Sequence, residues 1–579
     1  GFALHPPETL SLDSAKGLRP LESHSRVSYH SKFSLRKYFR ERRILKKQNF
    51  IKGSVILMIS AAVAKVLGAV FKIPLTNLLG GVGMSYFSAA YSIFMPVYAF
   101  TVTGLSTAVA AMTAKSRAFG MYGNIRRIRR IALLLFSIVG LAGSLLILLL
   151  ARPFSVLSSG DNEAALAVAM IAPTVLFGCI TAVERGYYEG MSNMYPTAFS
   201  QAAEGIVRVV TGLWLCGYVN SHGTEILKYF PEITDVRALA AAAGIAGVTL
   251  SSLGAMLFFA VLNLFSKKPK DKGEKHLTER GKITSELIKT ALPIGVSSVV
   301  TNLTAIIDMG TIIGCITYFG YKGDIPVGVA AEDIPRFVYG SFSGIALTVF
   351  NLVPSVTNML GKGILPCIAS AWSAGNKEEL RRNTIQALLT AAVIAVPSAV
   401  GIGILSPQIL HILYAGQSDE ANLCISSLRW LMPGMVCLCV SFPVFAMLQG
   451  IGKPSSPLKI MLLGTAAKTV GNIVFIPFMG ADGAAVSTTI CYGVILAVSL
   501  YTYLKAADIA ISLAPFAAVV YAGVLCGAAA YLVADICGRN NTGDITAAIA
   551  AVIAGGFVYL LSLYLLSVKV KRTKTTACV

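Results

Sequence analysis

Residues 61–100 read AAVAKVLGAVFKIPLTNLLGGVGMSYFSAAYSIFMPVYAF, an apolar stretch that nevertheless carries Lys65 and Lys72. A helix needs about 20 apolar residues to cross a hydrocarbon layer of about 30 Å. The stretch therefore predicts two membrane-spanning helices, over 53–79 and 84–112, and it places two charges inside the first of them.

Similar apolar segments continue along the whole chain of 579 residues. Hydrophobic residues make up 55% of the chain and charged residues only 13%, about half the share found in a soluble domain. The sequence predicts an all-α membrane protein with about fourteen transmembrane helices. These are 53–79, 84–112, 131–151, 163–183, 196–219, 238–265, 287–317, 337–365, 384–404, 423–449, 458–478, 482–504, 512–535 and 543–567.

Several charged side chains lie inside these segments. A charge at the centre of a membrane helix costs about 2.5–3.5 kcal/mol when it faces lipid. We therefore expect these side chains to line an internal polar cavity, which indicates a transporter. They are Lys65, Lys72, Glu204, Arg208, Asp308 and Lys468.

The net charge of +21 is distributed in a regular way. Basic residues gather before residue 53, around 113–130, around 266–289 and after 568, whereas the intervening loops lean acidic. This alternation follows the positive-inside rule, and it differs from the single basic face expected of a nucleic-acid-binding protein. We expect a multi-pass protein of the cytoplasmic membrane with both termini in the cytoplasm and no nucleic-acid partner.

The basic tail at the start of the chain lacks the apolar core of a cleavable signal peptide. We expect it to be mostly disordered and to rest on anionic membrane lipids through the cluster at 36–47.

The two halves of the chain echo each other. When YEGMSNMYP (188–196) is aligned with LQGIGKPSSP (448–457), Arg208 falls on Lys468. We expect two pseudo-symmetric six-helix lobes with a cavity between them. The predicted organisation is a tail (1–52), an N-lobe (53–265), a basic loop (266–286), a C-lobe (287–504), two extra helices (512–567) and a second basic tail (568–579).

Three stretches resemble a known family: 61–100, RGYYEGMSNMYPTAFSQAAEGIVR (185–208) and YGSFSGIALTVFNLVPSVTNMLGKGILP (339–366). They are similar to the stage V sporulation protein B family of polysaccharide exporters. Its superfamily also contains the multidrug (MATE) transporters and the lipid II flippases. The resemblance covers about 52–567. It implies a fourteen-helix, MATE-like and lipid II flippase-like fold, and alternating access that moves an isoprenoid-linked glycan to the outer leaflet.

In lipid II flippases the first helix carries functional arginines in a similar sequence context. Lys65 takes the first such place here and Lys72 lies near a second, so the resemblance implies cavity cations that bind substrate. Lysine keeps the charge of arginine but lacks its planar fork, which changes how a diphosphate is held.

Lys65, Arg208 and Lys468 lie near the expected midplane, and Lys72 and Asp308 lie in the outer half. With Arg208 and Lys468, the two lysines suit a diphosphate because charge-assisted hydrogen bonds strengthen in a dehydrated cavity. The alternatives are that Arg208 pairs with Glu204 one turn earlier, and that the lysines pair between helices or snorkel.

Asp308 is the only acid deep within 287–504, so it either pairs with Lys72 or binds a coupling proton or sodium.

Three asparagines either hydrogen-bond sugars or join helices. Two mid-helix prolines act either as hinges or as static kinks. These residues are Asn302, Asn351, Asn358, Pro96 and Pro354.

The eleven cysteines are scattered and no histidine cluster accompanies them, so we expect no metal site and no disulfide framework. The sequence also has no P-loop and no catalytic Ser/His/Asp order, so we expect no enzyme and no cofactor. Coupling to the membrane potential, to protons or to sodium stays open.

The predicted function is flipping of an undecaprenyl-diphosphate-linked saccharide, such as lipid II or another cell-wall or spore-cortex precursor. Its partners would be the lipid-linked glycan and cell-wall synthases, and the protein would be a monomer. The alternative is a cation-coupled multidrug exporter of the MATE type. A membrane glycan polymerase is a third reading, which the short outer loops disfavour.

Overall fold

The computed structural model describes residues 29–159, 161–230, 233–265, 278–323, 326, 329–512, 514–540 and 543–576. Within these residues every regular element is a helix, as expected for an all-α membrane protein. The first helices are α1 (Tyr29–Tyr98), the π-helical turn η1 (Ala99–Thr103), α2 (Gly104–Ala118), α3 (Tyr122–Ser159), α4 (Ala165–Ile171), α5 (Pro173–Gly190), α6 (Tyr195–Ile226), the 3₁₀ turn η2 (Leu227–Tyr229), α7 (Val236–Phe265) and α8 (Arg280–Phe319).

The remaining helices begin with the 3₁₀ turn η3 (Ala331–Asp333), α9 (Ile334–Ser341), the π-helical turn η4 (Phe342–Ala346), α10 (Leu347–Phe350) and α11 (Leu352–Ser373). They continue with α12 (Lys377–Ile404), α13 (Ser406–Leu413), α14 (Ser418–Gly450), α15 (Ser456–Met479), α16 (Ala481–Ala507), α17 (Ala514–Arg539) and α18 (Asp544–Thr576).

Helix α1 reverses direction at Gly80, where φ is 64° and ψ is −175°. The Oγ1 of Thr76 donates to the Sδ of Met84 at 3.6 Å, and the ring centroids of Phe71 and Phe87 are 6.1 Å apart. In a straight helix those two rings would stand about 24 Å apart along the axis. Glycine adopts this left-handed φ without a steric penalty. The two expected helices 53–79 and 84–112 therefore form an antiparallel hairpin.

Thirteen helices of the described residues are long and apolar enough to cross a membrane. Each of the fourteen expected segments overlaps one of these candidate spans. The first two segments share the span Ile59–Arg117, which contains the reversal at Gly80. The all-α membrane fold is thus confirmed, while the number of crossings stays a prediction.

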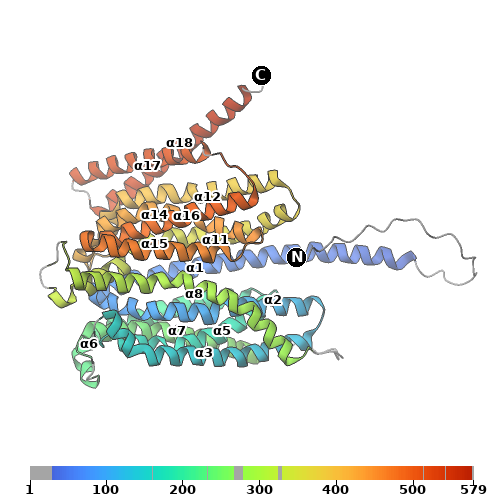
Figure 1. Ribbon diagram of the computed structural model, residues 1–579, viewed down its shortest axis with the longest axis horizontal. Coiled ribbons are helices and arrows are strands. Elements are labelled where there is room, and N and C mark those ends of the chain that lie inside the picture. The colour runs from blue at the N-terminus through green and yellow to red at the C-terminus, as the bar shows by residue number, and fades with distance from the viewer. Residues whose placement is uncertain are drawn as a thin grey trace, which may run out of the picture. The chain divides into compact units, whose positions relative to one another are not determined.

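The helices pack in two groups, which Figure 1 shows below and above α8. The first group includes α2, α3, α5, α6 and α7. Helix α1 packs on α6, where Ser60 donates to the carbonyl of Ala198 at 3.1 Å. The backbones of this group approach closely through small residues, since a Cβ on Gly247 would lie 2.2 Å from the Cα of Gly212. The second group includes η3, α9, η4, α10, α11, α12, α14, α15 and α16, and α17 packs on α12 and on α18.

Helix α8 contacts both groups. Its first half crosses η1 and α2, where a Cβ on Gly104 would meet the carbonyl oxygen of Ala291 at 2.3 Å. Its second half packs on α15. This helix therefore places a side chain such as Asp308 at the boundary between the groups.

Both expected hinge helices contain a π-helical turn. Pro96 lies in α1 just before η1, and η4 lies before Pro354, which sits in the first turn of α11. A π-turn leaves the regular i to i−4 hydrogen-bond pattern and frees backbone carbonyls locally. Hinge movement at the two prolines stays a prediction.

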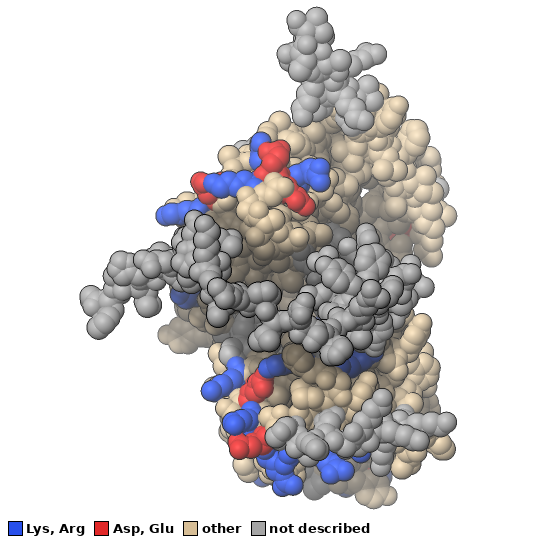
Figure 2. Space-filling view, turned by 90° about the vertical axis from the view of Figure 1, so that its right-hand side faces the viewer, with Lys and Arg blue, Asp and Glu red and all other residues tan. Residues whose placement is uncertain are grey.

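We call the end of the bundle with the turns 119–121, 191–194 and 374–376 the basic end. Figure 2 looks onto this end and shows Lys and Arg side chains gathered in two areas. There Lys377 hydrogen-bonds to Asp508 at 2.5 Å and holds the pKa of that carboxyl below its ordinary value. The opposite end, with Asp161, Asp235 and Asp333, is called the acidic end.

The two expected tails and the basic loop lie partly outside the described residues, which leave out 1–28, 266–277 and 577–579. Helix α1 begins at Tyr29, so the second part of the expected first tail is helical. The end of the expected basic loop forms the start of α8.

Candidate functional site

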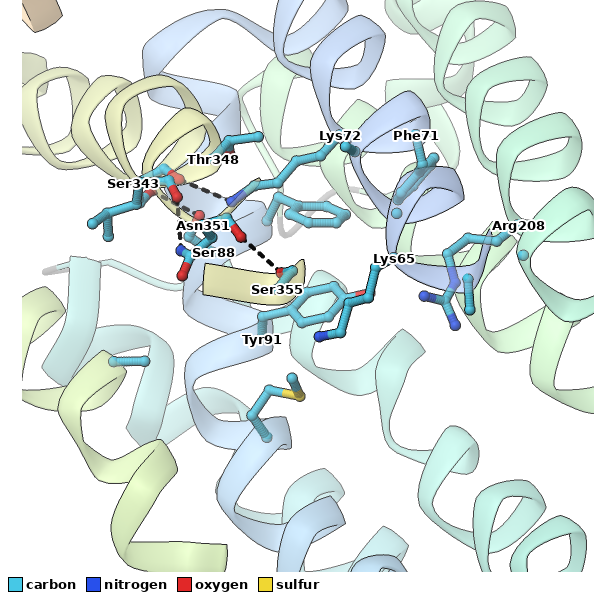
Figure 3. Close-up of a pocket in the computed structure, with 18 of the residues that line it drawn as sticks. Lys65, Phe71, Lys72, Ser88, Tyr91, Arg208, Ser343, Thr348, Asn351 and Ser355 are labelled. Atoms are coloured by element: carbon cyan, nitrogen blue, oxygen red, sulfur yellow. Dashed lines mark hydrogen bonds between the residues drawn. The ribbon is translucent and has the colours of Figure 1, made fainter. Parts of the chain in front are cut away.

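A cavity of about 690 Å³ lies between the two helix groups, and Figure 3 shows it in close-up. Both arms of the α1 hairpin line this cavity. The rest of its wall is formed by α5, α6, α8, α9, η4, α10 and α11. Its polar and aromatic lining includes Lys65, Lys72, Ser88, Tyr91, Ser92, Arg185, Gln201, Glu204, Arg208, Asp308, Tyr339, Ser343, Thr348, Asn351 and Ser355.

The two lysines of α1 lie in this cavity, as expected. The Nζ of Lys72 donates to the carbonyl oxygen of Ser343 at 2.9 Å, and the Ser343 hydroxyl lies 2.9 Å from that of Ser88. Ser343 belongs to the π-turn η4, whose irregular backbone leaves a carbonyl that can accept this bond. Lys72 thus links the two helix groups (Figure 3). Lys65 is exposed in the same cavity, two turns nearer the basic end.

Glu204 lies between two arginines. Its carboxylate accepts from Arg185 at 2.9 Å and from Arg208 at 3.0 Å. The predicted alternative that Arg208 pairs with Glu204 is therefore present, and a second cation shares the same acid. The Nε of Arg208 is buried and has no hydrogen-bond partner within the described residues. A guanidinium with an unsatisfied donor beside a cavity is suited to bind an anion.

Arg185 is a cavity residue that sequence reasoning missed. The expected helix 163–183 ends before Arg185, so the sequence places Arg185 in a cytoplasmic turn. The structure continues α5 to Gly190 because the chain stays buried beyond the apolar run. Arg185 is the first residue of the motif at 185–208, and this position is the signal in the sequence that points to it.

Asp308 pairs with Lys468, and the expected pair of Asp308 with Lys72 is wrong. The Nζ of Lys468 donates to one carboxylate oxygen of Asp308 at 2.6 Å, and the Nδ2 of Asn472 donates to the other at 3.1 Å. The estimated depth along the membrane gave a height for each residue but not the direction in which each helix face points. Because α15 packs on α8, Lys468 is the cation that reaches Asp308.

This pairing also changes the expected role of Lys468. Its side chain is only 4% exposed, and it is absent from the described residues that line the cavity. Lys468 therefore neutralises Asp308 from the side that faces away from the cavity, and it is not placed to contact a ligand in the cavity.

The remaining predicted residues divide between the cavity and the helix interiors. Asn351 lines the cavity, whereas the Nδ2 of Asn302 donates to the carbonyl of Ser298 in its own helix at 2.7 Å. Asn358 is exposed on α11 outside the described lining. Pro96 and Pro354 are buried and also lie outside it.

The helix groups are tied together at the acidic end. The tip of the α1 hairpin is held by α14, where Glu420 accepts from the backbone N–H of Gly81 at 3.0 Å. Asn77 donates to the carbonyl of Leu413 at 2.9 Å. A Cβ on Gly340 would lie only 1.7 Å from the carbonyl oxygen of Gly81, so the two backbones are in direct contact.

Ion pairs reinforce this closure across the same end. Arg336 of α9 contacts Asp161 at 2.5 Å, and Arg237 of α7 contacts Asp333 at 2.8 Å. Each pair joins a residue of the first group to one of the second.

Helices that could span a membrane, packed in two groups around a polar cavity, define a multi-pass membrane transporter. The chain belongs to the family described as "Polysaccharide biosynthesis protein", whose model matches residues 50–372. The MatE family model matches residues 342–474.

Two curated relatives are similar over most of their length. The lipid II flippase MurJ of Bacillus subtilis (strain 168) is 25% identical over 76% of this chain and 80% of its own. Stage V sporulation protein B of the same organism is 24% identical over 83% of this chain and 88% of its own. The first of these relatives is named as a flippase, in agreement with the expectation of a transporter for this chain.

Solved structures show the same fold. An inward-facing multidrug resistance MATE transporter of the MOP superfamily has a TM-score of 0.61 and 16% identity, over 79% of this chain and 98% of its own. The inward closed form of the lipid II flippase MurJ has a TM-score of 0.60 and 16% identity, over 90% of this chain and 99% of its own. The expected kinship with the polysaccharide-exporter and MATE families is confirmed by the two family models.

Proposed function

We propose that the protein flips an isoprenoid-diphosphate-linked saccharide from the inner to the outer leaflet of the cytoplasmic membrane by alternating access. The carrier is undecaprenyl diphosphate, and the glycan is lipid II or another cell-wall or spore-cortex precursor. The name of one curated relative, a lipid II flippase, supports this substrate class, and the name of the second links that relative to sporulation. In the membrane orientation that we propose, the basic end and both termini face the cytoplasm.

The observation that carries the proposal is the charge of the cavity. Four cationic side chains and two carboxylates are among its described lining residues, and one of those acids is already neutralised by Lys468. A diphosphate gains charge-assisted hydrogen bonds from this excess, and the low dielectric of the cavity strengthens them. The lining cations are Lys65, Lys72, Arg185 and Arg208.

The contacts that join the two helix groups at the acidic end are those expected before the first step of an alternating-access cycle. With that end outward, the contacts of Glu420 with Gly81 and of Arg336 with Asp161 close the cavity on the outside. A substrate made in the cytoplasm would meet the basic end first, where Lys and Arg side chains attract its phosphates.

The direct test is translocation of fluorescently labelled lipid II in proteoliposomes that contain the purified protein. Transfer across the bilayer is measured by loss of fluorescence when an impermeant quencher is added outside. We expect protein-dependent transfer that unlabelled lipid II inhibits. Transfer equal to that of protein-free liposomes, with labelled undecaprenyl diphosphate equally immobile, would overturn the proposal.

A cation-coupled multidrug exporter is the second candidate, because the MatE model matches part of the chain and a MATE structure shares its fold. The excess of cations in the cavity would repel a cationic drug. Proton-driven or sodium-driven uptake of a cationic dye into inverted vesicles would favour the exporter over the flippase.

A further inference from the structure

We propose that the two walls of the cavity recognise different parts of one substrate, and that Thr348, Asn351 and Ser355 on the second helix group select the saccharide. This inference rests on the proposed function, since it assumes a glycan joined to a lipid by a diphosphate. It adds a residue-level origin for glycan specificity.

The charges of the cavity are divided unequally between its walls. Every cationic side chain among the described lining residues belongs to the first group: Lys65 and Lys72 on α1, Arg185 on α5 and Arg208 on α6. Helix α8, at the boundary between the groups, contributes one carboxylate, Asp308, and Lys468 already neutralises it. The diphosphate is therefore attracted to the wall formed by α1, α5 and α6.

The opposite wall is polar without net charge. Thr348, Asn351 and Ser355 recur at intervals of three and four residues, so they share one face of the helix that runs through α10 and α11. Hydroxyl and amide groups both donate and accept hydrogen bonds, as sugar hydroxyls require. The most accessible of the three is Asn351, which is exposed within the cavity.

The hydrogen bonds on this wall leave capacity for a ligand. The Nδ2 of Asn351 donates to the carbonyl of Leu347 at 2.7 Å, and the Oγ of Ser355 donates to the carbonyl of Asn351 at 2.7 Å. An amide has two donor hydrogens and an acceptor oxygen, and a hydroxyl retains its lone pairs. Asn351 and Ser355 are thus held in place by their own helix, and each keeps an acceptor for a sugar hydroxyl.

The two walls carry polar side chains at the same spacing. Lys65 and Lys72 are seven residues apart, about 10.5 Å along the helix, and Thr348 and Ser355 have the same spacing. The bond from Lys72 to the carbonyl of Ser343 joins the two walls at one point (Figure 3). A diphosphate held by the lysines would therefore present its first sugars to the facing side chains.

The test compares two ligands that share the isoprenoid chain and the diphosphate: undecaprenyl diphosphate, and lipid II, which adds a peptide-bearing disaccharide. Binding of each to the full-length protein in nanodiscs is measured for the wild type and for a variant with both Asn351→Ala and Ser355→Ala. Loss of one or two hydrogen bonds should weaken lipid II binding about tenfold. Binding of undecaprenyl diphosphate should stay unchanged, which also shows that the variant is folded.

The matched control is Asn302→Ala. Asn302 donates to a backbone carbonyl four residues earlier, as Asn351 does, but lies outside the described lining. We expect this variant to bind both ligands like the wild type. Equal weakening of both ligands by the double substitution, or no weakening of either, would overturn the inference. Failure of the wild type to bind undecaprenyl diphosphate would instead overturn the proposed function.

Discussion

Lys468 donates from Nζ to Asp308 at 2.6 Å, and the two side chains are only 4% and 6% exposed. Residues from α15 and α8 thus form a buried ion pair beside the transport cavity. Removing one partner of such a pair leaves the other charge uncompensated, which costs about 3–5 kcal/mol, whereas removing both can be nearly neutral.

We therefore expect Lys468→Met and Asp308→Leu to lower the thermal unfolding midpoint in detergent far more as single substitutions than together. The unfolding midpoint of the purified variants measures this difference. Additive losses in the double variant would show that the two charges do not stabilise one another. Lys72→Ala serves as the control, since Lys72 bonds to a carbonyl and leaves no buried charge behind when it is removed.

The same pair bears on ion coupling. Both carboxylate oxygens of Asp308 are occupied, by Lys468 and by Asn472. We expect the double variant Asp308→Leu with Lys468→Met to keep whatever sodium and pH dependence wild-type translocation shows. Flipping in proteoliposomes with imposed sodium or proton gradients checks this. If ion dependence disappears in the double variant, Asp308 carries the coupling ion.

The positive charge of Lys65 should be required for transport. Lys65→Ala and Arg208→Ala should each reduce lipid II flipping at least tenfold, because each loses charge-assisted hydrogen bonds to the diphosphate. Lys65→Arg should retain part of the rate. The initial flipping rate at equal amounts of reconstituted protein is the readout. Normal flipping by Lys65→Ala would remove that residue from the substrate site.

Closure at the acidic end depends on the contact of Gly340 with Gly81. Gly340→Ala should separate the helix groups there, since the new methyl group would overlap a backbone carbonyl. In a variant without native cysteines, Asn351→Cys should then react faster with an impermeant thiol reagent added outside. Gly363→Ala is the control, because a Cβ there meets no atom within 4 Å. An unchanged labelling rate would mean that this contact does not hold the closure.

Orientation follows from the alternation of loop charge. Reporter fusions after Asp161, Lys272, Asp419 and Val579 should be outside, inside, outside and inside, respectively. Alkaline phosphatase and green fluorescent protein fusions distinguish the two sides. An external Val579 would contradict the expectation of an even number of crossings.

The sequence by itself determined the class of protein and the charges that make its cavity. Apolar segments of sufficient length, with Lys65, Lys72 and Arg208 inside them, indicated membrane helices around a polar interior. These properties can be read locally because hydropathy and helix length depend only on neighbouring residues. Most of the predicted ionisable residues do line the cavity.

Only the tertiary structure decided which charges meet. Height in the membrane suggested Lys72 as the partner of Asp308, but packing of α15 on α8 brings Lys468 to it. Arg185 entered the cavity because α5 extends beyond its apolar run. The direction in which a helix face points depends on contacts between segments distant in sequence, and no local pattern encodes them.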